Sequence, residues 1–122
     1  MATGSPRSIA LRKDYLAVLT KGKKLEIYDA RSGVLLKTWP VAAGAMRLDV
    51  HSGIAVYVVG RRVYVLRLAD GKHSVLAVAP RAIVGLELEA AGVVYAYNTV
   101  KGIEDVGNLA FVPLAKATSI LH

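Results

Sequence analysis

The sequence has no cysteine, few aromatic residues and no long apolar run. The absence of cysteine excludes disulfides, thiolate nucleophiles and cysteine-ligated zinc. The longest apolar run, Ile54–Val59, ends at Gly60 and falls far short of the ~20 residues that a membrane-spanning helix needs. No basic stretch followed by an apolar one opens the chain, so we expect no secretory signal. The compartment is left open.

Hydrophobic residues make up 54% of the 122 residues and charged residues 20%, which indicates a folded core rather than disorder. We expect residues 1–7 to form a flexible leader and residues 8–122 to form one domain. Sixteen Lys and Arg against nine Asp and Glu give a net charge of +7. That charge favours contacts with polyanions.

An internal repeat with a period of 38 organises the chain. Residues 14–33 align with residues 52–71 without a gap, so that both turn glycines and a basic pair coincide. A third copy begins near Val84, and its segment Gly92–Tyr97 is matched to Gly53–Val58. Asn108–Leu114 is then matched to Arg62–Leu68, after about seven extra residues within 99–107. The three repeats span about 8–45, 46–83 and 84–122.

Short apolar runs separated by Gly, Asp, Ser and Asn predict strands joined by tight turns. The expected strands are Ser8–Arg12, Tyr15–Thr20, Lys24–Tyr28, Leu35–Val41, Met46–Val50, Ile54–Val59, Arg62–Leu68, Ser74–Ala79, Val84–Leu88, Gly92–Tyr97 and Asn108–Leu114. If the third copy has a last strand, it must be formed by Thr118–Leu121, and these residues fit a helical turn equally well.

The second strand of each copy is apolar on both faces, as in Ile54–Val59. A sheet with one wet face would alternate instead, so each sheet should be covered by others. Four antiparallel strands every ~40 residues is typical of a β-propeller. We therefore predict an all-β fold of three consecutive four-stranded antiparallel propeller-type blades, a partial propeller. Three blades are too few for a ring of four to eight. The chain is thus expected either to belong to a larger propeller or to form a homo-oligomer, two copies giving six blades.

The segment Tyr28-Asp29-Ala30-Arg31-Ser32-Gly33, followed by Trp39, resembles the end of a WD40 repeat, with Tyr-Asp in place of Trp-Asp. It is also similar to the Asp-x-x-Thr-Gly turn of quinoprotein (PQQ-like) repeats. The resemblance covers about residues 8–114, and neither family's full motif is present. It implies propeller blades. The propeller resemblance also implies an alternative function, a fragment or subunit of a propeller enzyme, either quinoprotein-like or hydrolytic, with a site at the channel mouth.

Because strand directions alternate, turns between second and third strands share one rim of the blades. This rim should be basic, and its residues are Lys21, Lys23, Lys24, Arg61, Arg62, Arg81 and Lys101. Such a basic rim attracts phosphates, acidic peptides or anionic surfaces. Lys and Arg in turns also guard exposed strand edges, which is the simpler interpretation. The absence of stacking aromatics argues against nucleic acid as the partner.

The 38-residue spacing places Asp49 at the position of Glu87, and His51 at the position of Glu89. All lie on the first, channel-side strands, where adjacent carboxylates can hold a hard cation or act as an acid/base pair. The same alternation also fits a strand with one wet face. The three histidines have no metal-ligand spacing, and Trp39 is expected to pack between blades. We predict no metal and no cofactor.

These observations favour a non-catalytic binding or scaffold module of propeller type. Its partner would be a protein or peptide, with an anionic one favoured by the charge, contacted through the basic rim or an exposed blade face. An incomplete domain without independent activity is a third possibility.

Overall fold

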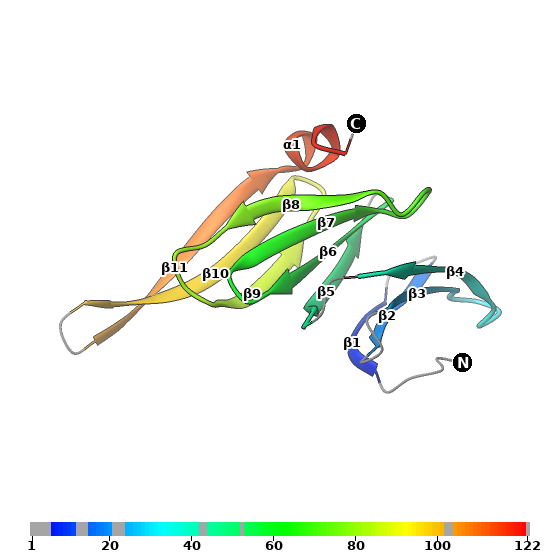
Figure 1. Ribbon diagram of the computed structural model, residues 1–122, viewed down its shortest axis with the longest axis horizontal. Helices are drawn as coiled ribbons and strands as arrows, with labels where there is room; N and C mark the ends of the chain where they lie inside the picture. Colours follow the sequence, from blue (N-terminus) through cyan, green and yellow to red (C-terminus); the bar gives the residue numbers. More distant parts are fainter. Residues whose placement is uncertain are drawn as a thin grey trace.

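The computed structural model describes residues 6–11, 15–20, 24–41, 44–51, 53–101 and 104–121. Eleven strands and one short helix lie in these ranges, and the strands form three antiparallel sheets that follow one another along the chain (Figure 1). The expected all-β class is confirmed. No helix in these ranges is long and apolar enough to cross a membrane.

Two of the sheets have four strands in sequence order. Sheet A consists of β1 (Pro6–Leu11), β2 (Tyr15–Thr20), β3 (Lys24–Asp29) and β4 (Leu35–Pro40). Sheet B consists of β5 (Met46–His51), β6 (Ile54–Val59), β7 (Arg62–Arg67) and β8 (His73–Val78). Each of these strands lies within one or two residues of the expected boundaries. The turn residues between apolar runs therefore located the strands correctly.

The third sheet differs from the prediction by one strand. Sheet C contains β9 (Ile83–Leu88), β10 (Gly92–Lys101) and β11 (Glu104–Pro113), in the order β11-β10-β9. The helix α1 (Leu114–Ser119) follows β11 directly, so the helical alternative for the end of the third copy is correct. The buried residues Ala117 and Leu121 explain the helix, because its packing anchors this segment to the core.

The 38-residue period is visible in the backbone hydrogen bonds of the outer turns. The N–H of Gly33 donates to the carbonyl of Asp29, and the N–H of Gly71 donates to the carbonyl of Arg67 in the same way. The side chains differ. The Asp29 carboxylate accepts from the backbone of Arg31 and Ser32, whereas Arg67 forms an ion pair with Asp70. The matching positions of the two turns thus carry side chains of opposite charge, Asp29 in the first and Arg67 in the second.

The core is divided into two clusters by sheet B. On β6, Ile54, Val56 and Val58 face sheet C, whereas Ala55 and Tyr57 face sheet A. Both sets are buried, so the prediction that this strand is covered on both faces is confirmed. The inner strands β1, β5 and β9 follow one another across the three sheets (Figure 1).

The strand pairing corrects the alignment of the third copy by one residue. Val56 pairs with Asp49 and Val65, and Val94 pairs with Glu87 and Phe111. Val94 therefore occupies the place of Val56, and the period stays 38 through β10. The predicted match of Gly92–Tyr97 to Gly53–Val58 is off by one. A one-residue shift exchanges the two faces of a strand, so the correction decides which side chains face outward.

The extra residues of the third copy lengthen a hairpin. Strands β10 and β11 stay paired from Gly92 with Pro113 to Lys101 with Glu104. This hairpin projects beyond the other sheets (Figure 1).

Candidate binding surfaces

Strand β5 carries Asp49, whose carboxylate is tied to the next sheet. Asp49 Oδ2 accepts a hydrogen bond from the backbone N–H of Leu88 at 2.8 Å, and Oδ1 accepts from the N–H of Val50 at 2.9 Å. Glu87 and Glu89, the other two acids expected beside the channel, are exposed on and just after β9. In the described ranges no group of three or more His, Asp or Glu residues is placed to hold a metal ion. The cation site or acid/base pair hypothesised for the three carboxylates stays a prediction.

Part of the basic rim is brought together by the backbone. The N–H groups of Ala79 and Ile83 donate to the carbonyls of Arg61 and Gly60, at 2.7 and 3.0 Å. These bonds hold the connection that contains Arg81 against the β6–β7 turn. Lys24, Arg61, Arg62 and Arg81 are all exposed. Lys21, Lys23 and the side chain of Lys101 lie outside the described residues.

The outward face of sheet C is apolar and open. The repeat places Leu109 at the position of Leu25 and Val63, which are fully buried in sheets A and B. Phe111 likewise occupies the position of Ile27 and Val65. In sheets A and B these positions are covered by the following sheet, whereas the side chains of Leu109 and Phe111 are 78% and 53% exposed. We call Val94, Ala96, Leu109 and Phe111 the open face. It corresponds to the face of sheet A that is buried against sheet B and to the face of sheet B that is buried against sheet C.

The centre of the face of sheet A that points away from sheet B is shielded. Val18, Glu26 and Tyr28 lie on this face and are each no more than 5% exposed. Burial raises the pKa of Tyr28, and the neighbouring Glu26 carboxylate raises it further. The two ends of the row of sheets are nevertheless unequal. On this face of sheet A the exposed apolar side chains, Leu11 and Leu35, lie on the edge strands β1 and β4, whereas the exposed Leu109 and Phe111 lie on β11 of sheet C.

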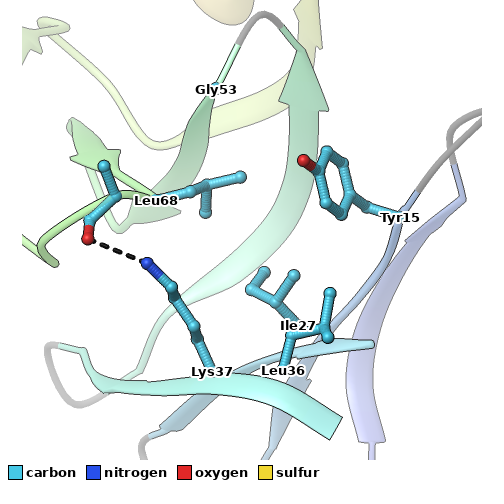
Figure 2. Close-up of a pocket in the computed structure, with 7 residues that line it drawn as sticks. Tyr15, Ile27, Leu36, Lys37, Gly53 and Leu68 are labelled. Carbon is cyan, nitrogen blue, oxygen red and sulfur yellow. Dashed lines mark hydrogen bonds between the residues drawn. The ribbon is translucent and has the colours of Figure 1, made fainter. Parts of the chain in front are cut away.

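A cleft of about 430 Å³ opens between sheets A and B. Its lining includes Tyr15, Ile27, Leu36 and Leu68 (Figure 2). Lys37 crosses the mouth and donates a hydrogen bond from Nζ to the carbonyl of Ala69 at 2.8 Å (Figure 2). The strand pattern gave no sign of this cleft, because its lining combines residues of β2, β3 and β4 with the β5–β6 and β7–β8 turns of sheet B.

Trp39 closes the same interface at the outer strands. Its ring lies directly against Gly71 in the β7–β8 turn, and the Lys37 Nζ lies 5.7 Å from the ring centroid. Trp39 is also packed against the cluster between sheets A and B. The expectation that it packs between blades is confirmed.

Comparison with known proteins identifies the fold. No family model matches the sequence, and no curated protein matches it. Solved structures do match, among them the β-propeller domain of Cps50 (Swd1) from Myceliophteria thermophila, with a TM-score of 0.63 and 15% identity over 96% of this chain. The chain has a propeller-type fold.

Two further solved structures match most of the chain. The computationally designed Ika4 protein gives a TM-score of 0.64 with 18% identity over 79% of this chain. Hydrazine synthase from Kuenenia stuttgartiensis gives 0.69 with 13% identity over 93% of this chain. The chain spans 62%, 35% and 44% of the lengths of Ika4, hydrazine synthase and Cps50, respectively. Identities this low show the fold alone, so assignment to WD40 or quinoprotein repeats stays a prediction.

Proposed function

We propose that this chain is a non-catalytic binding module of β-propeller type whose contact surface is the open face of sheet C. One observation carries the proposal. Leu109 and Phe111 are exposed at positions whose equivalents Val63 and Val65 are completely buried. Large apolar side chains grouped on an exposed surface mark interaction sites. The alternative, a fragment of a propeller enzyme, stays a prediction without an observation in its favour.

The occupant we propose is a second copy of the chain. The centre of the corresponding face of sheet A is covered, because Val18, Glu26 and Tyr28 are buried there, and this disfavours a head-to-tail ring. Two open faces can instead meet about a twofold axis, so that each copy buries the same residues. Such a dimer brings six sheets together. Since each copy carries a charge of +7, added salt should strengthen the association by screening repulsion.

Sedimentation equilibrium over a range of protein concentrations and salt concentrations tests this proposal. We expect a dimer whose dissociation constant rises at least tenfold when Leu109→Asn and Phe111→Asn are combined, since burying one such side chain contributes about 1.5–3 kcal/mol. Val78→Asn is the matched control, because Val78 is 56% exposed on β8 and lies outside the open face. A chain that is monomeric at every concentration, or a dimer that the double variant leaves intact, would overturn the proposal.

A further inference from the structure

Sheet C lacks the outer strand that completes the other two sheets. Sheets A and B end in β4 and β8, each six residues long, whereas sheet C ends at β11. In the part of the chain that the structure describes, no strand pairs with the outer edge of β11. An unpaired edge presents a row of N–H and C=O groups that another strand can bind.

The pairing of β10 with β11 shows which backbone groups face this edge. The N–H of Leu114 donates to the carbonyl of Ala91, so these two residues form a hydrogen-bonded pair. Hydrogen-bonded pairs alternate along an antiparallel ladder. Val112 and Ala110 therefore direct their backbone groups toward β10. It follows that Leu109 and Phe111 direct their N–H and C=O groups to the free edge.

The chain does not fill this edge with its own next segment. Residues after Pro113 turn into α1, and Ala117 and Leu121 are buried in the cluster between sheets B and C. Pulling α1 out to form a strand would expose these side chains. The edge is consequently available to a segment from another chain.

We propose that the outer edge of β11 binds an extended segment of a partner polypeptide, which becomes the fourth strand of sheet C. Strand addition of this kind gains affinity from main-chain hydrogen bonds and specificity from alternate side chains. The existing outer strands define the chemistry of the partner. Strand β8 has the sequence HSVLAV and lacks acidic residues, and its Leu76 is buried. Strand β4 places Trp39 in the equivalent interface.

The proposed occupant is therefore an extended segment of about six residues that lacks acidic side chains and has one large apolar side chain. By analogy with Trp39 on β4, which pairs with Leu25, that side chain would lie beside Leu109 on the open face. The inference extends the proposed function to the edge of the same sheet, but it depends on backbone groups that a face-to-face dimer does not use.

Binding of a capped synthetic peptide with the chain's own sequence 73–79, HSVLAVA, tests the proposal by fluorescence anisotropy. Phe111→Ala and Phe111→Pro are compared, because both remove the aromatic ring and only proline removes the outward N–H. Proline is tolerated at edge positions whose N–H faces solvent, so both variants should fold. We expect saturable binding that is at least tenfold weaker in the proline variant than in the alanine variant.

Two N-methylated peptides test the same idea without changing the protein. One carries methyl groups on the backbone nitrogens of alternate residues, and the other carries them on the remaining residues. Only one set of N–H groups faces β11, so we expect one peptide to bind and the other to bind at least tenfold more weakly. Equal binding of both, or no saturable binding at millimolar peptide, would overturn the proposal. Dimerisation lost in Phe111→Ala with peptide binding retained would support the edge site independently of the proposed function.

Discussion

Asp49 on β5 accepts a hydrogen bond from the backbone N–H of Leu88 on β9, with 2.8 Å between Oδ2 and the nitrogen. The bond connects the inner strands of sheets B and C. Sheet A has no such acceptor at the equivalent position. Ala10 pairs with Ala17 and Ala17 with Ile27, as Asp49 pairs with Val56 and Val56 with Val65, so Ala10 takes the place of Asp49, 39 residues earlier. Each carboxylate oxygen of Asp49 accepts a hydrogen bond from a backbone N–H, so this side chain has a structural role.

Asp49→Ala should therefore lower the free energy of unfolding by about 1–3 kcal/mol, since it removes the charged acceptor of the hydrogen bond from the backbone N–H of the buried residue Leu88. Asp49→Asn should have a smaller effect, because the amide oxygen can still accept one bond. Urea denaturation measures both. Glu89→Gln is the control, as Glu89 is an exposed acid near the same strand ends. Equal midpoints for Asp49→Ala and the parent would contradict the role of this bond.

Asp70 makes stability depend on pH in a defined range. The Arg67 side chain, followed by the backbone N–H of Lys72, lowers the pKa of Asp70 from 3.8 to about 2. A carboxylate whose pKa falls on folding stabilises the protein above its unfolded pKa, and this contribution is lost as the pH falls through the folded pKa. The contribution of Asp70 should therefore be nearly complete above about pH 5, decrease between about pH 5 and pH 2, and disappear below the folded pKa of about 2.

Thermal melts of the parent and Asp70→Asn check this dependence. Asp70→Asn should lower Tm slightly at neutral pH, and the difference should become small at pH 2 and vanish at lower pH. The effect should shrink in high salt, because the ion pair with Arg67 is largely exposed. A Tm difference that persists unchanged at pH 2 would exclude this carboxylate as its source.

The contact between Trp39 and Gly71 holds the outer parts of sheets A and B together. A Cβ on Gly71 would overlap the Trp39 ring, and Gly71 also has φ +76°. Gly71→Ala should destabilise the fold by about 2–4 kcal/mol, from overpacking together with backbone strain. Gly53→Ala separates the two causes, since Gly53 has the same φ but no atom within 4 Å of its added Cβ. Urea denaturation followed by the fluorescence of Trp39, the single tryptophan, should show the smaller loss for Gly53→Ala.

The basic rim predicts salt-dependent retention on a polyanion. Replacing Lys24, Arg61 and Arg62 by Ser should weaken retention on heparin and reduce the slope of log affinity against log salt by about one per lost contact. Replacing Arg31, Lys72 and Lys116 by Ser removes the same charge elsewhere and serves as the control. If both triple variants lost the same retention on heparin, the retention would depend on net charge alone and not on the basic rim.

The sequence located strands well because glycine turns and apolar runs repeat every 38 residues. The alignment of the third copy was wrong by one residue because it matched Gly92 to Gly53, although the two positions require glycine for different physical reasons. Gly53 adopts a left-handed turn with φ +76°, whereas a Cβ on Gly92 would collide with the carbonyl of Val112 on the neighbouring strand. A short apolar segment such as residues 118–121 also carries no pattern that separates strand from helix, and the packing of Ala117 decided the outcome.

The surface features were harder to predict than the strands. Leu109 and Phe111 have the same hydrophobic character as Val63 and Val65, so the sequence alone places all four in a core. Their exposure follows from the absence of a further sheet in the described structure, which is a property of the tertiary arrangement. The hydrogen bond from Leu88 to Asp49 could not be predicted either, since its donor is a backbone N–H, which nearly every residue type has.

The position of sheet B between two separate cores has a consequence for how the molecule opens. The cluster between sheets A and B shares no residue with the cluster between sheets B and C. Neighbouring residues on β6, such as Val56 and Tyr57, belong to different clusters and are joined only through the backbone. Amide hydrogens of β6 should therefore exchange with solvent more slowly than those of the outer sheets, because both clusters must separate before this strand is released.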